Sequence, residues 1–179
     1  MSKPVRVFFG GINGVGKTTL ASEFCSRNKF EHVRASSVLM NSLKVRSQRE
    51  LEEVPETLKT KLMREELPLL VSSLDFAVID AHYIVCLGNV YDLGSLNEKL
   101  AKSLTHLVHL VAEPRVILSR RAKEIEKRAR ELDIAKIELD QNVSLLFSEY
   151  LAKKYDLPLI KVANQDINKA LNAIERAIL

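Results

Sequence analysis

The sequence Gly11-Ile12-Asn13-Gly14-Val15-Gly16-Lys17-Thr18 fits the pattern G-x-x-x-x-G-K-[ST] of a phosphate-binding loop. It follows an apolar run, Val5 to Phe9, and leads directly into residues that favour a helix. Strand, loop and helix in this order form the context in which the pattern binds a polyphosphate. Three glycines let successive main-chain NH groups point into one concavity, which suits an anion. The sequence therefore predicts a loop that binds the phosphates of a nucleoside triphosphate.

Each part of this loop has an expected role at the phosphates. The positive end of the following helix dipole attracts the anion, and Lys17, expected to face solvent, reaches the β and γ phosphates. The Thr18 hydroxyl is a natural ligand for a Mg²⁺ ion that bridges them. A chance glycine-rich turn is the alternative, and the flanking strand and helix argue against it. The loop residues predicted to bind ATP are Gly11, Asn13, Gly14, Val15, Gly16, Lys17, Thr18 and Thr19.

A second informative strand, Phe76 to Asp80, consists of four apolar residues that end in a carboxylate. In a protein with a phosphate-binding loop, an acid at the carboxyl end of such a strand is the expected partner of the magnesium ion. We therefore predict a metal site formed by Thr18 and Asp80. The alternative is an aspartate at an ordinary strand exit. His82 follows two residues later, where it is either a structural loop residue or a group that positions a phosphate or a water.

The remaining pattern alternates strands with helices, which predicts an α/β fold with a parallel sheet covered on both faces. The segment 81–94 reads as irregular, with Cys86 in a loop. We expect strands at 4–9, 30–34, 76–80, 105–111 and 157–162. We expect helices at 17–27, at 38–43 after a cap at Ser36 or Ser37, from Pro55 to 67 with a bend or restart at Pro68, and at 95–103, 114–132, 135–154 and from Asp166. The helix at 135–154 is expected to bury Val143, Leu146, Phe147, Tyr150 and Leu151.

Composition indicates one globular domain of 179 residues, with 46% hydrophobic and 28% charged residues and no apolar run long enough to span a bilayer. No secretory hydrophobic region precedes the loop and two cysteines suggest neither a disulfide framework nor a metal site, so we expect a cytoplasmic location. The net charge of +4 fits either a polyphosphate-binding enzyme or a nucleic-acid partner. With no Trp and 6% aromatic residues, dedicated single-strand binding is disfavoured.

Arginines cluster on the predicted helix 114–132, at Arg120, Arg121, Arg128 and Arg130. Phosphoryl transfer needs positive charge around the migrating oxygens, and arginines on a closing segment commonly supply it. We therefore expect a short lid at about 115–134, with Arg121 and Arg128 among the catalytic groups. Glutamates spaced for i to i+4 pairs on the same helix favour the alternative, a solvated face. Arg46 and Arg49 are placed to grip an acceptor phosphate, although a polar helix face explains them equally well.

With these pieces placed, the chain resembles the adenylate-kinase branch of phosphate-loop nucleoside monophosphate kinases over essentially its whole length. Asp80-Ala81-His82 is similar to the acid-x-His motif of archaeal-type adenylate kinases and of the adenylate-kinase-like ATPases of ribosome maturation. The resemblance implies a five-stranded parallel sheet in the order 2-3-1-4-5, with ATP and Mg²⁺ as cosubstrate and cofactor. It also implies AMP as the acceptor, held by helices at about 36–73.

The resemblance further implies roles for individual residues. Lys17 and His82 would act at the transferring phosphoryl group, together with Arg121 and Arg128. Arg120, Arg121 and Asn164 would contact ATP, and the acceptor would be bordered by Ser36, Ser37, Arg46, Arg49 and His82. Ala35-Ser36-Ser37 replaces the Thr-Gly-Asp sequence of many adenylate kinases. The hypotheses are therefore a kinase for AMP or another small acceptor, and an ATPase that acts as an assembly factor on an RNA-protein particle.

Overall fold

The central strand β1 (Val5–Gly10) divides the core into two clusters, one on each face of the sheet. Side chains alternate along a strand, so Val7 and Phe9 point to one face and Phe8 to the other. All three are fully buried, because helices cover both faces. This computed structural model describes residues 3–87, 90–123 and 132–179.

Five parallel strands form the main sheet in the order β2-β3-β1-β6-β7, which is the predicted order 2-3-1-4-5 when these strands are counted along the chain. The other four strands are β2 (Glu31–Arg34), β3 (Phe76–Asp80), β6 (His106–Val111) and β7 (Leu159–Ala163). Each lies within two residues of its predicted range. The predicted α/β class with a parallel sheet is confirmed.

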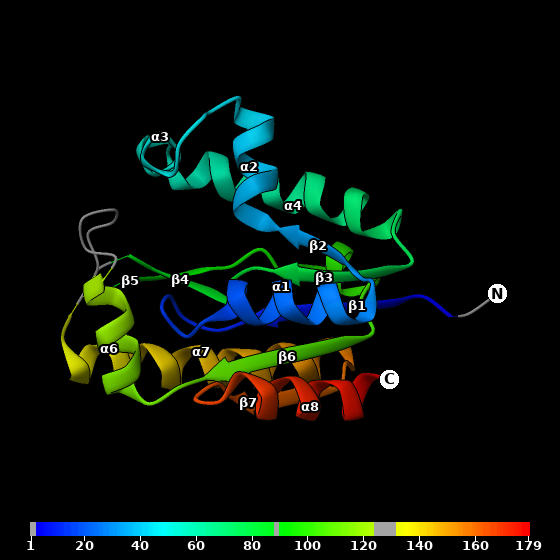
Figure 1. Ribbon diagram of the computed structural model, residues 1–179. Helices are drawn as coiled ribbons and strands as arrows, with labels where there is room; N and C mark the ends of the chain where they lie inside the picture. Colours follow the sequence, from blue (N-terminus) through cyan, green and yellow to red (C-terminus); the bar gives the residue numbers. More distant parts are fainter. Residues whose placement is uncertain (1–2, 88–89, 124–131) are drawn as a thin grey trace.

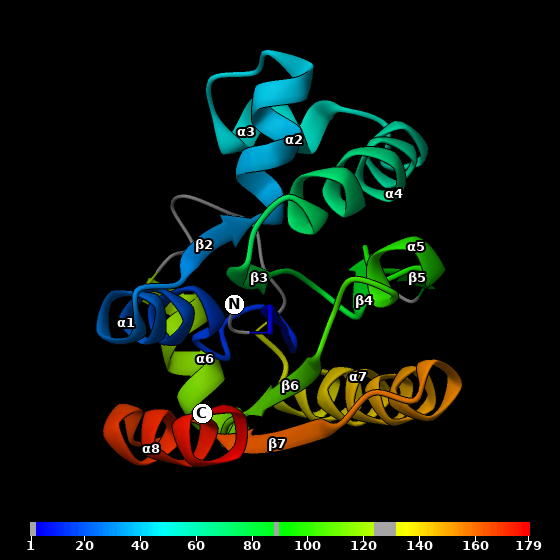
Figure 2. The same cartoon turned by 90° about the vertical axis from the view of Figure 1, so that its right-hand side faces the viewer.

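Helices cover the sheet in two layers and extend beyond one edge. Figure 2 shows α1 and α8 on one side of the sheet and α7 on the other, while α2 and α3 stand beyond the β2 edge. Helix α4 packs Leu67 and Val71 into the same core cluster as Phe8. The bounds are α1 (Lys17–Asn28), α2 (Ala35–Leu43), α3 (Gln48–Glu53), α4 (Glu56–Ser72), α5 (Glu98–Ala101), α6 (Pro114–Lys123), α7 (Ile134–Tyr155) and α8 (Ile167–Ile178). In the part of the chain that the structure describes, no helix is both long and apolar enough to cross a membrane.

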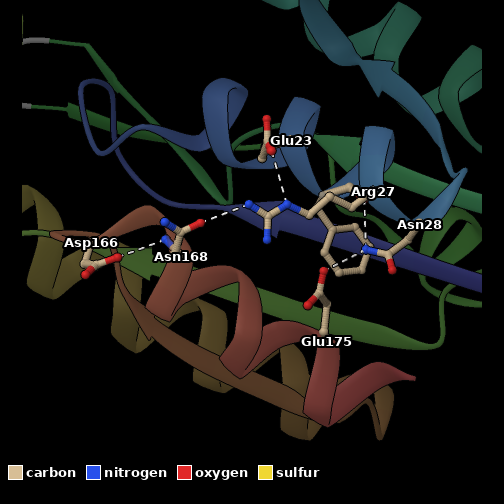
Figure 3. A network of polar contacts seen from close by, with 7 residues as sticks. Glu23, Arg27, Asn28, Asp166, Asn168 and Glu175 are labelled. Atoms are coloured by element: carbon tan, nitrogen blue, oxygen red, sulfur yellow. Dashed lines mark hydrogen bonds and ion pairs between the residues drawn. The ribbon is translucent and has the colours of Figure 1, made fainter.

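A polar network joins α1 and α8, the two helices that lie on the same side of the sheet (Figure 3). The Arg27 guanidinium donates to Glu23 on its own helix and to Asn168 Oδ1 at 2.9 Å on α8. The Asn28 amide reaches Glu175 at 3.1 Å. These contacts hold α8, and the loop that precedes it, against the helix that follows the phosphate loop.

The segment 81–94 differs from the irregular chain that we predicted. It contains an antiparallel pair, β4 (Ile84–Leu87) and β5 (Val90–Leu93), and Cys86 lies in β4 rather than in a loop. The strands are short and the segment is punctuated by glycine, which hides their alternation. Burial raises the pKa of the Cys86 thiol to about 11, so it stays protonated at neutral pH.

The start of α2 and the course of α4 also differ from prediction. Ser36 and Ser37 lie inside the first turn of α2, whose N-cap residue is Arg34, and no side chain caps that end. Helix α4 continues to Ser72 through Pro68 without a restart. Proline cannot donate to the carbonyl four residues back, that of Arg64, and the Asn97 side-chain amide donates to this oxygen at 3.1 Å instead.

The buried face of α7 was predicted only in part, because Leu151 is buried and Phe147 packs against the core, but two other predicted residues are exposed. Leu146 is 65% exposed and Tyr150 is 52% exposed, while Ser144 and Ser148 are buried. These serines share one face with Ile137, Asp140 and Leu151, because residues four and three apart lie above one another on a helix. Small side chains on that face allow the helix to lie close to the sheet.

Candidate functional site

The predicted loop lies at the carboxyl ends of the strands, between β1 and α1, and opens on a cavity of about 1120 Å³. Figure 1 shows this end of the sheet beside α6 and the β4–β5 pair. Gly16 is the N-cap residue of α1 with φ 92°, a conformation that favours glycine. A Cβ there would lie 2.5 Å from the Asn164 amide, so the loop and the segment after β7 pack too closely for a side chain.

Lys17 is buried, with 7% of its surface exposed, so our expectation that it faces solvent is wrong. Its ammonium donates to the carbonyl oxygens of Gly11 at 2.9 Å and Ile12 at 3.0 Å. The side chain therefore folds back over its own loop and lines the cavity. A bound polyphosphate would exchange these neutral acceptors for anionic oxygens, which bind an ammonium more strongly.

Thr18 and Asp80, predicted to share a metal ion, meet in the structure. The Thr18 hydroxyl donates to Asp80 Oδ2 at 2.7 Å, although the two residues belong to α1 and β3. A hydroxyl and a carboxylate at one point form the oxygen-rich environment that Mg²⁺ prefers. The residues present therefore fit a magnesium ion.

Charged and polar neighbours keep the Asp80 carboxyl ionised. Burial alone would raise its pKa, but His32, the Lys17 ammonium, the Thr18 hydroxyl and His82 together hold the pKa below its usual value. His32 Nε2 lies 3.7 Å from Oδ2, which is longer than a hydrogen bond, so it acts by electrostatics. An ionised carboxylate is the form that binds a cation.

His82 faces the phosphate loop from the exit of β3. Its Nδ1 lies 3.0 Å from the carbonyl oxygen of Gly11. Because a carbonyl only accepts, Nδ1 carries the proton in this contact. The side chain also lines the cavity, so His82 lies beside the place where the terminal phosphate of a nucleotide would bind.

Arg120 and Arg121, the described members of the predicted arginine cluster, have different surroundings. Arg120 lines the cavity and donates to Val15 O at 2.9 Å and to Asn164 O at 3.2 Å. Arg121 is 4% exposed and donates to Asn13 O at 3.1 Å. It therefore supports the loop without lining the cavity. Arg128 and Arg130, with the rest of 124–131 in the predicted lid, lie outside the described residues.

The cavity brings together most of the predicted nucleotide residues but few of the predicted acceptor residues. Predicted residues that line it are Asn13, Gly14, Gly16, Lys17, Thr18, Thr19, Ser36, Asp80, His82, Arg120 and Asn164. Gly11 and Val15 belong to the loop but do not line the cavity. Ser37, Arg46 and Arg49, which were predicted to border the acceptor, do not line it either. The Arg49 side chain is 90% exposed and lies 4.0 Å from Glu53 on its own helix.

Sequence reasoning missed most of the lining beyond the phosphates. Arg34 at the end of β2 lines this part of the cavity, as do Glu56 and Lys59 on α4, whose side chains form an ion pair at 2.7 Å. Apolar residues Leu39, Leu51 and Met63 complete this half. For Arg34 alone, the sequence carried a signal that it lines the cavity. It stands at the carboxyl end of a parallel strand, where ligands bind in such sheets.

The fold and the loop define a P-loop protein of the kinase-like α/β class. A family model described as an AAA domain (AAA_17) matches residues 10–138, so the chain belongs to this family. Comparison with curated protein sequences finds no match.

Solved structures with the same fold include several kinases. The shikimate kinase from Acinetobacter baumannii in complex with shikimate has 15% identity and a TM-score of 0.69, over 99% of this chain and 93% of that one. The shikimate kinase from Bacteroides thetaiotaomicron has 18% identity and a TM-score of 0.62, over 97% of both chains. A putative kinase from Chloroflexus aurantiacus has 18% identity and a TM-score of 0.60, over 99% of this chain and 97% of that one. At these identities the likeness concerns the fold alone.

Proposed function

We propose that this protein transfers the γ phosphoryl group of ATP to a small-molecule acceptor, with AMP as the acceptor implied by the resemblance. The observation that carries the proposal is the hydrogen bond from Thr18 to Asp80 beside the buried Lys17, because it joins the loop to a carboxylate on the neighbouring strand β3. That constellation is the one that ATP-dependent phosphoryl transfer requires.

The residues of the chain act mainly by position and charge. The uncapped N-terminus of α1 and the loop amides hold the phosphates, and Lys17 stabilises the charge on the migrating oxygens. Arg120 and Asn164, which bond to each other and to the loop, border the nucleotide. Thr18 and Asp80 would hold Mg²⁺, which supplies charge neutralisation at the phosphate oxygens.

The acceptor half lies between α2, α4 and the β4–β5 pair, within the same cavity. One cavity that holds both substrates allows the acceptor to lie in line with the terminal phosphate. Its lining fits a small molecule, and the fold is shared with kinases of small acceptors, including shikimate kinases. The helices at about 36–73 are therefore proposed as the acceptor-binding part of one domain.

An acceptor panel tests this function. The protein is incubated with ATP and Mg²⁺, alone and with AMP, other nucleoside monophosphates or shikimate, and ADP formation is measured. We expect fast ADP formation only when an acceptor is present, with AMP as the best. A protein that binds no magnesium nucleotide would refute the proposal.

A second candidate function is an ATPase that acts on an RNA-protein particle. The contact of His82 with the Gly11 carbonyl favours it, because a histidine beside the terminal phosphate is placed to orient a water molecule. Under this alternative, hydrolysis proceeds without a small acceptor and is stimulated by ribosomal particles. The acceptor panel with such particles added separates the two functions.

A further inference from the structure

The β4–β5 pair forms one wall of the cavity without belonging to the main sheet. Among the described residues, its two strands pair with each other and with no other strand. Figure 2 shows the pair on the same side of the sheet as α7. Val85, Cys86 and Leu93 of this pair line the cavity. Two strands alone have marginal stability, so contacts with the rest of the protein must fix the position of this wall.

Three side chains join the pair to α7. Tyr91 lies on β5, opposite Cys86 in the register of the pair, and its hydroxyl donates to Asp140 Oδ1 at 2.9 Å. The Lys136 ammonium donates to the same oxygen at 2.8 Å and to the Tyr91 hydroxyl at 3.0 Å. The ammonium also lies 4.7 Å from the centre of the Tyr91 ring. We call this closed triangle of Tyr91, Lys136 and Asp140 the latch.

The latch keeps its charges away from water. Asp140 is 3% exposed, and Tyr91 and Lys136 are half-buried. Hydrogen bonds to Asp140 and Tyr91 raise the pKa of the Lys136 ammonium above its usual value, so this group is cationic at neutral pH. If Tyr91 moved away, a buried carboxylate would lose one of its donors, which is costly. The latch therefore favours one position of β5 on α7 over displaced ones.

The base of the β4–β5 pair connects this position with His82. The Gly94 amide donates to Tyr83 O at 2.9 Å, and a Cβ at Gly94 would lie 1.8 Å from the carbonyl oxygen of His82. These two segments are packed so closely that one cannot shift without the other. His82 Nδ1 in turn lies 3.0 Å from the carbonyl oxygen of Gly11 in the phosphate loop. Contacts therefore continue from α7 through β5 to the loop.

Building on the proposed function, we propose that Tyr91, Lys136 and Asp140 are positioning residues that fix the wall of the acceptor half and, with it, His82. None of the three lines the cavity, so they act through the β4–β5 pair rather than on a substrate. Without the latch, the wall and His82 would adopt displaced positions, and a misplaced acceptor reacts more slowly. The ATP half, which is formed by the phosphate loop and α1, should keep its affinity.

Hydrogen exchange tests the latch in the ligand-free protein. Tyr91→Phe removes the hydroxyl and keeps the ring, while Asp140→Asn removes the charge with little change in shape. Both variants should speed amide exchange in β4 and β5 by about tenfold or more, as expected for the loss of a hydrogen bond to a charged group. Strands β1 and β3 should exchange as in the wild type. Tyr150→Phe on α7, whose tyrosine is 52% exposed, is the matched control and should leave β4 and β5 unchanged.

Steady-state kinetics test whether the latch matters for transfer. ADP release is measured with ATP and Mg²⁺, alone and with AMP as the acceptor probe. Tyr91→Phe should reduce kcat/KM for AMP by about fivefold or more, with the KM for ATP within about twofold of the wild type. Tyr150→Phe should match the wild type in both constants. A role in overall stability alone would not separate the two substrates in this way.

Three results would overturn the inference. They are exchange in β4 and β5 that Tyr91→Phe does not change, faster exchange that is equal in all strands, and a kcat/KM for AMP that stays as in the wild type or falls only in step with that for ATP. In each case the wild type still releases ADP, so the proposed function stands. A wild type that releases no ADP in either assay refutes the proposed function and the positioning role together. Melting curves show whether each variant folds, and Tyr91→Phe decides the outcome if Asp140→Asn does not.

Discussion

At the scale of single residues, the site depends on side chains whose partners are main-chain oxygens. Lys17 and Arg120 donate to carbonyls of the phosphate loop, and His82 donates to Gly11 from the other side. Such bonds connect the loop to the side chains around it and help to hold it in shape. The same side chains can turn to phosphate oxygens when a nucleotide binds, since charged partners form the stronger bonds.

Lys17→Ala is predicted to lower the rate of phosphoryl transfer by about a factor of 10² to 10³, the effect of removing one preorganised donor to the transition state. The fold should persist, because the ammonium donates to two carbonyls of its own loop and not to the hydrophobic core. Steady-state kinetics measure the first effect and circular dichroism the second. Lys153→Ala on α7 is the matched control, and equal turnover in both variants would contradict the role of Lys17.

Asp80→Asn is predicted to raise the magnesium concentration needed for half-maximal rate by about tenfold, because the amide cannot supply the negative charge that binds the cation. Titration with Mn²⁺ in the presence of ATP gives a readout that does not depend on turnover. Identical metal titrations of variant and wild type would remove Asp80 from the metal site. His32, 3.7 Å from Oδ2, should remain in place in both proteins.

At the scale of elements, Asn97 joins two helices with one side chain. Its oxygen accepts from Leu100 N at the start of α5, and its nitrogen donates to Arg64 O, the carbonyl that Pro68 leaves without a helical partner. Helix α4, which lines the acceptor half of the cavity, is therefore continuous because of a residue outside it.

Asn97→Ala is predicted to lower the free energy of unfolding by about 2 kcal/mol, from the lost cap and the unsatisfied carbonyl. Pro68→Ala restores a backbone donor to Arg64 O, so it should recover part of that loss in the double variant. Urea unfolding of the four proteins in this cycle measures the coupling. Strictly additive effects would show that the two residues do not share the carbonyl.

At the scale of the whole molecule, the fold buries a histidine on one face of the sheet, beside the core cluster that contains Tyr83. His109 is 1% exposed on β6, stacks on Tyr83 with ring centroids 5.5 Å apart, and lies near Lys17. Burial, with a smaller contribution from the Lys17 ammonium, lowers its pKa from 6.5 to about 4. The folded state therefore binds this proton less readily than the unfolded chain does.

The unfolding free energy should consequently fall as the pH drops from 6.5 to about 4, because the unfolded state gains the proton first. The lowered pKa corresponds to a loss of at most about 3 kcal/mol. His109→Phe keeps an aromatic ring against Tyr83 and should make the stability less dependent on pH over this interval. Thermal melts of both proteins between pH 7 and pH 4 test this, and parallel curves would contradict it.

Much of the fold could be read from the sequence, because its signals are local. The glycines of the loop, the apolar strand 76–80 and the alternation of strands with helices specify backbone conformation over short stretches. Prediction from short stretches of sequence failed where the burial of a side chain depends on residues that are distant in the sequence. Leu146 and Tyr150 on α7 were expected inside, yet the buried face of that helix carries Ser144 and Ser148. Asn97 similarly could not be connected with Pro68 until α4 and α5 were seen side by side.

The sequence by itself determined the phosphate loop, the carboxylate that meets it and the parallel α/β class, since each follows from short-range patterns and from the chirality of strand connections. The order of the strands came from the resemblance to a known family. Only the tertiary structure decided what surrounds the acceptor. That half of the cavity combines residues from β2, α2, α3, α4 and the β4–β5 pair, elements that come together through packing. Packing also left Arg34 facing the cavity and turned Arg49 to solvent, because a side chain's direction is set by the surface against which its element rests.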